Sequence, residues 1–390
     1  MNKTKLKAII KRVPLLGHWS KLIYDFIGER KLNNRVNQMI SKKELPYCDQ
    51  LPERLSVGHE PTIRCNLRCK MCYQGETREL RREELDTNNI LSIYKKLEER
   101  MTDIKLVGGE PMVRDDIINL IAYLNNNNKK ISLQTNCTLF NQDNILKLRT
   151  FTNLKDIITS LDGPKEIHDN IRGVPGAFSR LEESLKLIRL HLPWVKITVF
   201  ATLLLKDNLD KMLGLIDTCK QLKIETINIL FEQVYSTAEI NQTKKILKNI
   251  FDWDEEDYRI NTQTRDPIFS TEIKSVELKK KLEAIRNYGF KRGCYVNFTP
   301  FNYYDHLDKY IGEQKGKAFC LKLLNSEIRI NQEGDVVWCD IIEKSFGNLV
   351  KKSIEEIWSS TEYQKFRKYL FTNSFPICSR CCKAIYREDI

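Results

Sequence analysis

Six short runs rich in β-forming residues alternate with six helical runs between residues 57 and 251, and this alternation restricts the fold more than any other feature. Strands are predicted at 57–64, 104–107, 130–134, 156–161, 196–204 and 226–230. Helices are predicted at 84–101, 116–126, 144–151, 178–191, 209–222 and 238–251. Strand–helix pairs in series form a parallel sheet with right-handed crossovers. Six units favour an α/β fold with an open, partial (β/α)6 TIM-like barrel over a closed eight-stranded one.

The chain outside this alternation is expected to form three further parts. Residues 1–54 are predicted to be a basic, helical N-terminal extension, followed by the barrel over 55–251. Residues 252–318 are polar and irregular apart from a helix near 276–287, and we interpret them as a connector that lines or covers a site. Residues 319–390 are expected to form a small domain with a β-hairpin around Gly334, a helix over 354–370 and a cysteine-rich tail.

Composition excludes several classes of protein. An apolar content of 41% is too high for intrinsic disorder. Residues Lys11, Arg12, Pro14 and Gly17 interrupt any secretory signal, and no uncharged apolar run approaches the roughly 18 residues of a membrane span. We therefore expect a cytoplasmic protein, in which disulfides are a poor explanation for 12 cysteines.

Three of these cysteines directly follow the first predicted strand. Cys65, Cys69 and Cys72 lie in the run CNLRCKMC, at the strand end where parallel α/β barrels carry function. Thiolates suit iron–sulfur clusters or zinc, but three ligands are one too few for a closed zinc site. On a four-iron cluster, three cysteines leave one iron open to bind a substrate.

The cysteine run resembles the signature of the radical S-adenosylmethionine (SAM) superfamily. Gly108-Gly109-Glu110-Pro111, at the next predicted strand end, is similar to the GGEP motif of the same superfamily. The resemblance implies a [4Fe-4S] cluster on the three cysteines, with the amino and carboxylate groups of SAM on the open iron.

The resemblance also implies roles for residues around SAM. Gly108 and Gly109 would allow close backbone approach to the ligand, and Glu110 would receive the methionyl ammonium. Met71, just before Cys72, would pack on the adenine, a task that Tyr73 could share.

Matches continue around the fourth predicted strand. Ser160-Leu-Asp-Gly-Pro and Ile171-Arg172-Gly173 resemble the peptide- and sulfatase-maturating branch, in which a Ser and an Arg hold the SAM carboxylate. These positions are Ser160 and Arg172; the alternative for Arg172 is an ordinary surface or helix-entry arginine. A Thr-Asn-Gly turn of the family corresponds to residues 135–137, with Cys137 in place of Gly.

The later cysteines resemble the SPASM or twitch extensions, which carry auxiliary iron–sulfur clusters. Cys320, Gly334 and Cys339 match the start of such an extension, and the tail supplies CSRCC at 378–382. On this resemblance, one auxiliary cluster of the [4Fe-4S] type is expected on Cys320, Cys339, Cys378 and Cys381, with Cys382 as an alternative to Cys381. A zinc site on the same thiolates is the structural alternative.

The resemblance implies radical chemistry. A reduced cluster cleaves SAM to a 5′-deoxyadenosyl radical, which takes a hydrogen from the substrate, and an auxiliary cluster suggests that an oxidation follows. That oxidation needs a base, and Asp340 corresponds to the base proposed in sulfatase-maturating enzymes. The alternative is a solvated or structural carboxylate.

Three functions remain open. The first is a dehydrogenase-type oxidation of a small molecule such as a sugar or alcohol; the second is a maturase that oxidises, crosslinks or epimerises a ribosomal peptide. With only 64 residues before Cys65, we expect no built-in leader-binding domain. A non-catalytic iron–sulfur or nucleic-acid-binding protein is the distant third, since no nucleic-acid motif accompanies the net charge of +12.

Partners are expected on the same grounds. The resemblance implies a reductant such as flavodoxin or ferredoxin. The first 60 residues hold 12 Lys or Arg against 6 Asp or Glu, which fits contact with an anionic surface or an acidic partner. No nucleic acid is expected.

Overall fold

A computed structural model describes residues 50–75, 83–261, 273–300, 303–312, 317–324 and 326–387, together with Gln38. Most of the predicted N-terminal extension therefore lies outside the described residues. Within the described residues, no helix combines the length and the apolar character that a membrane crossing requires.

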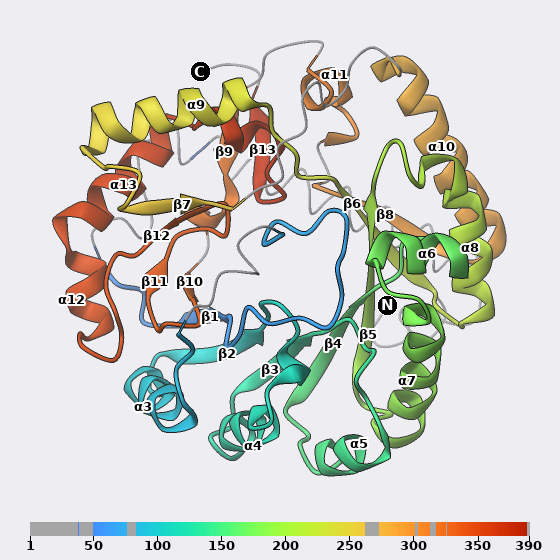
Figure 1. The fold of residues 1–390 in the computed structure, drawn as a ribbon, viewed down its shortest axis with the longest axis horizontal. Helices are drawn as coiled ribbons and strands as arrows, with labels where there is room; N and C mark the ends of the chain where they lie inside the picture. The colour runs from blue at the N-terminus through green and yellow to red at the C-terminus, as the bar shows by residue number, and fades with distance from the viewer. Residues whose placement is uncertain are drawn as a thin grey trace, which may run out of the picture.

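The described chain forms a curved, nine-stranded sheet with helices on its outer side (Figure 1). The strand order is β11-β10-β1-β2-β3-β4-β5-β6-β8, and all neighbours from β10 to β8 pair in parallel. These strands are β1 (Leu55–His59), β2 (Met101–Leu106), β3 (Lys130–Gln134), β4 (Leu154–Ser160), β5 (Lys196–Leu203), β6 (Thr226–Phe231), β8 (Tyr295–Thr299), β10 (Glu327–Ile330) and β11 (Val336–Val337). The prediction of an α/β fold with a partial barrel is confirmed.

Two small antiparallel pairs lie outside this sheet. They are β7 (Tyr258–Ile260) with β12 (Ile342–Lys344), and β9 (Lys317–Cys320) with β13 (Ala384–Arg387). The pair β9–β13 joins two segments of the C-terminal region, and the pair β7–β12 joins that region to the chain that follows the predicted barrel.

The helices alternate with the strands as the sequence predicts. The helices between barrel strands are α3 (Thr87–Leu97), α4 (Ile117–Asn126), α5 (Gln142–Leu148), α6 (Lys165–Arg172), α7 (Ala177–His191), α8 (Met212–Gln221), α9 (Thr237–Ile246) and α10 (Ser275–Arg292). Later helices are α11 (Leu307–Tyr310), α12 (Ile354–Ser359) and α13 (Thr361–Thr372). Capping boxes begin α5, α9 and α12, where Asn141, Ser236 and Ser353 accept hydrogen bonds from the first helical turn.

Side chains alternate between the two faces of the barrel sheet. On β4, Leu154 and Ile157 are buried, whereas Asp156 and Ser160 are half-buried on the opposite face. Polar pairs span neighbouring strands on that inner face: Ser56 Oγ donates to Asp103 Oδ1 at 2.6 Å and Thr198 Oγ1 to Asp156 Oδ1 at 3.1 Å. The concave face is thus polar and partly open, which suits a ligand-binding surface.

The description of residues 252–318 as irregular apart from one helix is wrong in one respect. Residues 295–299 form β8, which pairs with β6 and extends the barrel sheet at one edge. The run Tyr-Val-Asn-Phe-Thr is β-rich, but its polar neighbourhood conceals it. The predicted helix is present, as the longer α10.

The C-terminal region also differs in detail from the prediction. The predicted hairpin is present as β10–β11, but β10 also pairs in parallel with β1, so it extends the barrel sheet at the other edge. The predicted helix over 354–370 is two helices, because Ser360 ends α12 and caps α13 with its side chain. Hydrogen bonds from Lys96 of α3 to the carbonyls of Leu349 and Val350 add a further contact with the barrel.

Candidate radical site and iron–sulfur centres

The loop with Cys65, Cys69 and Cys72 follows β1 and is fixed against the end of α6. The amide of Arg68 donates to the carbonyl of Arg172 at 3.0 Å, and that of Lys70 donates to the carbonyl of Ile171 at 2.9 Å. Gly173 ends α6 with φ = 69°, and a Cβ at this position would lie 2.3 Å from the carbonyl oxygen of Arg68. Only glycine permits both the conformation and this close approach.

Gly108 and Gly109 perform a similar task from the end of β2. A Cβ on Gly108 would lie 2.3 Å from the Thr62 carbonyl oxygen, and one on Gly109 would lie 2.2 Å from that of Arg64. The amide of Gly109 donates to Thr62 at 2.9 Å. The close backbone approach that the structure shows is therefore to the loop leading into Cys65; an approach to SAM itself stays a prediction.

Glu110 is fully buried and already organises its surroundings. Its Oε1 accepts hydrogen bonds from Thr135 Oγ1 at 2.7 Å and from the Met112 amide at 3.0 Å, and Oε2 accepts one from the Asn136 amide at 2.6 Å. Burial raises the pKa of Glu110 to about 7, against the effect of these three donors. A cationic ligand beside it would stabilise the carboxylate form.

Cys137 follows these partners in a left-handed conformation, with φ = 57°. The turn that resembles a Thr-Asn-Gly turn thus keeps the backbone that glycine prefers, although a buried cysteine occupies it. The substitution leaves the hydrogen bonds to Glu110 in place.

Arg172 is nearly buried and is held by ionic partners. Its Nε donates to Asp162 Oδ2 at 2.6 Å, and Nη1 lies 3.5 Å from Cys69 Sγ. Burial opposes the charge, but Asp162 and Cys69 hold the pKa of Arg172 above its usual value. An ordinary surface arginine is therefore excluded. Ser160, at the end of β4, is half-buried on the concave face.

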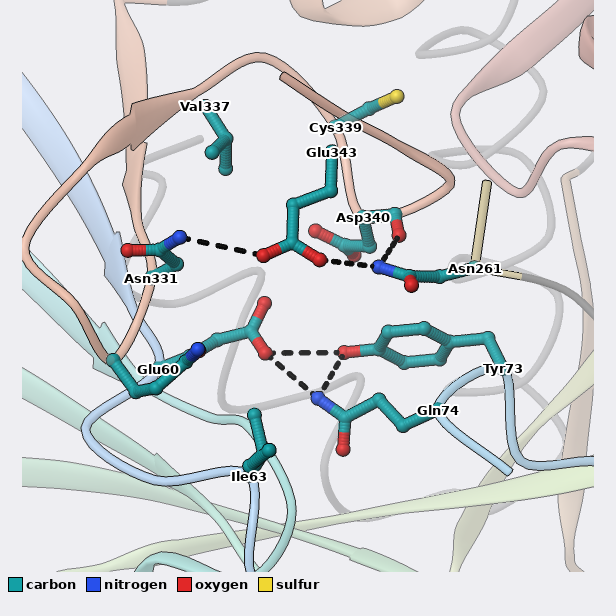
Figure 2. Close-up of a pocket in the computed structure, with 11 residues that line it drawn as sticks. Glu60, Ile63, Tyr73, Gln74, Asn261, Asn331, Val337, Cys339, Asp340 and Glu343 are labelled. Atoms are coloured by element: carbon teal, nitrogen blue, oxygen red, sulfur yellow. Dashed lines mark hydrogen bonds between the residues drawn. The ribbon is translucent and has the colours of Figure 1, made fainter. Parts of the chain in front are cut away.

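The two residues proposed to contact adenine differ in their placement. Met71 is half-buried in the cysteine loop. Tyr73 instead points into a polar pocket, where its hydroxyl donates to Glu60 Oε2 at 3.4 Å (Figure 2). Tyr73 thus contacts the pocket, and its contact with SAM stays a prediction.

The early thiols interact electrostatically with one another, as ligands of one cluster would. Burial raises the pKa of Cys65 to about 11, with smaller contributions from Glu110, Cys69 and Cys72. Cluster assembly must therefore displace a proton from Cys65. No three His, Cys, Asp or Glu side chains in the described ranges converge on a single metal ion. A cubane does not require such convergence, because each thiolate binds a different iron.

The polar pocket beside Tyr73 contains the predicted base. Asp340 lines it together with Glu60, Glu343 and Asn261 (Figure 2). Glu343 accepts hydrogen bonds from the side-chain amides of Asn261 at 2.6 Å and Asn331 at 3.3 Å. Acceptor groups therefore dominate this pocket.

Arg329, on β10, joins two of these carboxylates. Its guanidinium forms an ion pair with Asp340 and donates from Nε to Glu60 Oε1 at 2.9 Å. Burial opposes its charge, but Asp340 and Glu60 hold the pKa of Arg329 well above its usual value. Burial also raises the pKa of Glu60, against the effect of Arg329.

Sequence reasoning missed Glu60, Arg329, Asn261 and Glu343. None belongs to a recognised motif. Two of them could have been found from their position in the sequence. Glu60 directly follows a strand, and Arg329 alternates with buried neighbours on β10. Residues at such positions of an inner barrel face are candidates for ligand contact.

The late cysteines gather around the short helix η7 (Pro376–Arg380). Cys378 interacts electrostatically with Cys320 and Cys339, and burial raises the pKa of all three thiols. Backbone amides already donate to two sulfurs: Ile342 N lies 3.2 Å from Cys339 Sγ, and Lys383 N lies 3.4 Å from Cys381 Sγ. Amide donors of this kind stabilise cluster thiolates.

Buried donors without acceptors also lie among these cysteines. The indole Nε1 of Trp338 and the hydroxyl of Tyr235 have no hydrogen-bond partner within hydrogen-bonding distance among the described residues. Trp338 Nε1 is directed toward Cys320 and lowers the pKa of its thiol, opposing the larger effect of burial. Since orphaned buried donors are costly, the residues present fit a sulfur-rich group.

Cys381 and Cys382 have different surroundings. The Cys381 thiol interacts most strongly with Cys382, and less strongly with Cys378 and Cys320. The Cys382 thiol interacts with Lys383 and Asp340. These neighbours favour Cys381 as the fourth member of the set.

Comparisons with known proteins agree with this arrangement. A family model described as the radical SAM superfamily matches residues 59–219, and one described as an iron–sulfur cluster-binding domain, SPASM, matches residues 320–382. An AdoMet-dependent heme synthase of Methanosarcina barkeri is 24% identical over 325 residues, covering 80% of this chain and 83% of the relative.

Two further matches are narrower or more distant. The subtilosin biosynthesis protein AlbA of Bacillus subtilis is 29% identical over 157 residues, 39% of this chain and 34% of the relative. The crystal structure of Streptococcus suis SuiB superposes with a TM-score of 0.57 at 17% identity, covering 80% of this chain and 68% of that one. The last match shows a shared fold.

Proposed function

The chain belongs to the radical SAM superfamily and carries a C-terminal SPASM domain, and we propose that it oxidises a small, hydroxyl-bearing molecule such as a sugar or alcohol. It is a radical SAM enzyme that uses SAM, a [4Fe-4S] cluster and an auxiliary iron–sulfur cluster. We assign the SAM-binding cluster to Cys65, Cys69 and Cys72. The auxiliary cluster is assigned to Cys320, Cys339, Cys378 and Cys381.

The bound groups supply the radical step: SAM and its reduced cluster provide a 5′-deoxyadenosyl radical that takes a hydrogen atom, and the auxiliary cluster accepts a second electron. The chain itself must hold the substrate, exclude water and accept the proton that completes a two-electron oxidation. A flavodoxin or ferredoxin would return the cluster to its reduced form.

The observation that carries this proposal is the position of Asp340. It directly follows Cys339 of the auxiliary set, and it lines the same pocket as Tyr73, which directly follows Cys72 of the early set. A substrate at this pocket would have a carboxylate beside it and would adjoin residues next to both cysteine sets.

Arg329 prepares Asp340 for its role. The ion pair with the guanidinium fixes the Asp340 carboxylate in the pocket. Glu60 shares the same guanidinium, so the positive charge stays compensated after Asp340 is protonated.

The pocket lining supports a hydroxyl-bearing substrate. Glu60, Asp340 and Glu343 offer carboxylate oxygens, and Asn261 Oδ1 is buried without a hydrogen-bond partner among the described residues. These groups accept hydrogen bonds, so they select a ligand that donates them and repel one rich in carboxylates.

Peptide modification is the second candidate. It is favoured by the match to a bacteriocin biosynthesis protein, although that match covers 39% of this chain. Three relatives that align over 80–85% of the chain are named heme synthases, and heme is a small molecule.

The proposal is tested with anaerobically reconstituted protein, SAM and dithionite. Deuterated polyols and amino sugars, and separately ribosomal precursor peptides, are screened for deuterium transfer into 5′-deoxyadenosine. Transfer from a polyol or amino sugar supports the proposal. Transfer from peptides alone replaces it with the second candidate, and no 5′-deoxyadenosine under any condition contradicts both.

The role of Asp340 is tested with the substrate found in that screen. Asp340→Asn removes the proton acceptor, so product should fall by about 100-fold or more while 5′-deoxyadenosine formation persists. Asp252→Asn, which replaces an exposed carboxylate on the surface, is the matched control and should behave as wild type. Equal product from Asp340→Asn and wild type would remove the assignment.

A further inference from the structure

A buried tyrosine next to the auxiliary cysteines has a hydroxyl without an acceptor. Tyr235, between β6 and α9, is completely inaccessible to solvent. Its hydroxyl makes no hydrogen bond to any described residue. Leaving such a group unpaired costs about 1–3 kcal/mol, so this position calls for an acceptor that the polypeptide does not provide.

The surroundings of Tyr235 indicate what that acceptor is. Burial, followed by the thiols of Cys381, Cys378, Cys382 and Cys339, raises the pKa of Tyr235 well above its usual value. These four cysteines, which are cluster ligands or candidate ligands, interact with Tyr235 electrostatically, and no described residue forms a hydrogen bond with its hydroxyl.

Two neighbouring tyrosines, Tyr303 and Tyr310, differ from Tyr235 in having hydrogen-bond acceptors. Tyr303 donates to the carbonyls of Cys381 at 2.8 Å and Ser379 at 3.2 Å. Tyr310 donates to the carbonyl of Glu232 at 3.0 Å. These two side chains are equally buried, yet both hydroxyls have protein acceptors.

We propose that Tyr235 donates its hydroxyl hydrogen to a sulfur of the auxiliary cluster, as a residue that tunes this cluster. Reduction increases the negative charge on the sulfurs, so a donor stabilises the reduced form and raises the reduction potential. This makes the cluster a better acceptor for the electron that the substrate radical releases. The inference deepens the proposed function and rests on the auxiliary cluster that this function uses.

The test compares the reduction potential of the auxiliary cluster in variants of the full-length chain. Cys65, Cys69 and Cys72 are replaced by Ala in every sample, so that the auxiliary cluster alone gives the optical and paramagnetic signals. Tyr235→Phe should lower the midpoint potential without changing the iron content. Tyr310→Phe removes a hydroxyl that is already paired to a carbonyl, and should leave the potential where it is.

Equal potentials for Tyr235→Phe and the Tyr235 parent, or equal shifts for both tyrosine variants, would overturn the inference. If Tyr235→Phe loses the auxiliary cluster, its potential has no meaning, so a second measurement uses the Tyr235 parent alone. The reduced cluster in the Tyr235 parent should show a strongly coupled hydrogen that exchanges in D2O, and its absence contradicts the inference. Failure of the proposed oxidation leaves both signals intact, so the two ideas fail separately.

Discussion

At the scale of residues, local sequence motifs identified the candidate cluster and SAM ligands. They did not identify residues whose role depends on an ion pair with a distant position. The cysteine run, Glu110 and Arg172 were recognisable because their spacing is local. Arg329 and Glu60 form one ion pair across 269 positions of sequence, and only the parallel pairing of β10 with β1 brings them together. No local pattern encodes such a contact.

The structure also adds to the residue roles that the family resemblance implied. Gly108 and Gly109 were predicted to approach the ligand, whereas the contacts present show them against the loop that leads to Cys65. Arg172 was predicted to hold the SAM carboxylate, which stays a prediction; the contacts present are hydrogen bonds to Asp162 and Cys69. One residue thus links the end of α6 to the cluster loop.

His59 provides a prediction about pH. It is buried at the end of β1, with Nδ1 2.7 Å from the Tyr94 hydroxyl, and burial followed by Arg114 lowers its pKa to about 3. Between pH 6.5 and 3 the unfolded chain therefore binds a proton here that the folded chain does not. Stability should fall as the pH falls through this range, by up to about 1.4 kcal/mol per pH unit from this group.

Urea unfolding at pH 7.5, 6.5 and 5.5 measures this effect. His59→Gln should lose less stability than wild type on acidification, while His191→Gln, at a partly exposed position, should keep the wild-type slope. A wild-type slope in His59→Gln would contradict the assignment.

At the scale of elements, long amphipathic helices and β-rich runs were predictable because each carries its own periodicity. The helix over 116–126 and the strand over 130–134 were predicted within one residue of their observed bounds. The short strand β8 was not, because five residues in a polar context give too weak a pattern. The division between α12 and α13 depends on one capping serine inside a continuous helical pattern.

Gly173 offers a test of how α6 holds the cysteine loop. Gly173→Ala should displace the loop, since the added Cβ would meet the Arg68 carbonyl at 2.3 Å. We expect loss of the SAM-binding cluster and of 5′-deoxyadenosine formation, while the auxiliary cluster remains. Iron analysis and electron paramagnetic resonance of the reduced protein measure this selective loss.

Gly176→Ala is the matched control for that variant. Gly176 has a similar positive φ of 78°, but its added Cβ would meet only the flexible end of Arg180 at 3.1 Å. Both variants carry the same backbone strain, of about 1 kcal/mol. Equal cluster loss in the two would show that strain, and not contact with the cysteine loop, is responsible.

At the scale of the whole molecule, the barrel and the C-terminal region share one sheet. Hairpin β10–β11 continues the barrel beyond β1 and places Asp340 beside Glu60 and Tyr73 (Figures 1 and 2). The sequence predicted both parts but not this junction, because parallel pairing between distant strands leaves no periodic signal. The junction is what brings Tyr73 and Asp340, each adjacent to a cysteine of a different set, to one pocket.

The central claim is that this chain holds two clusters of different kinds, one open and one closed by four cysteines. Mössbauer spectroscopy with iron analysis, with and without SAM, tests it most directly. We predict about eight irons per wild-type chain, one site of which responds to SAM, and about four after replacement of Cys65, Cys69 and Cys72 by Ala, with the SAM response lost. Four irons in the wild type, or a SAM response that survives this replacement, would contradict the account.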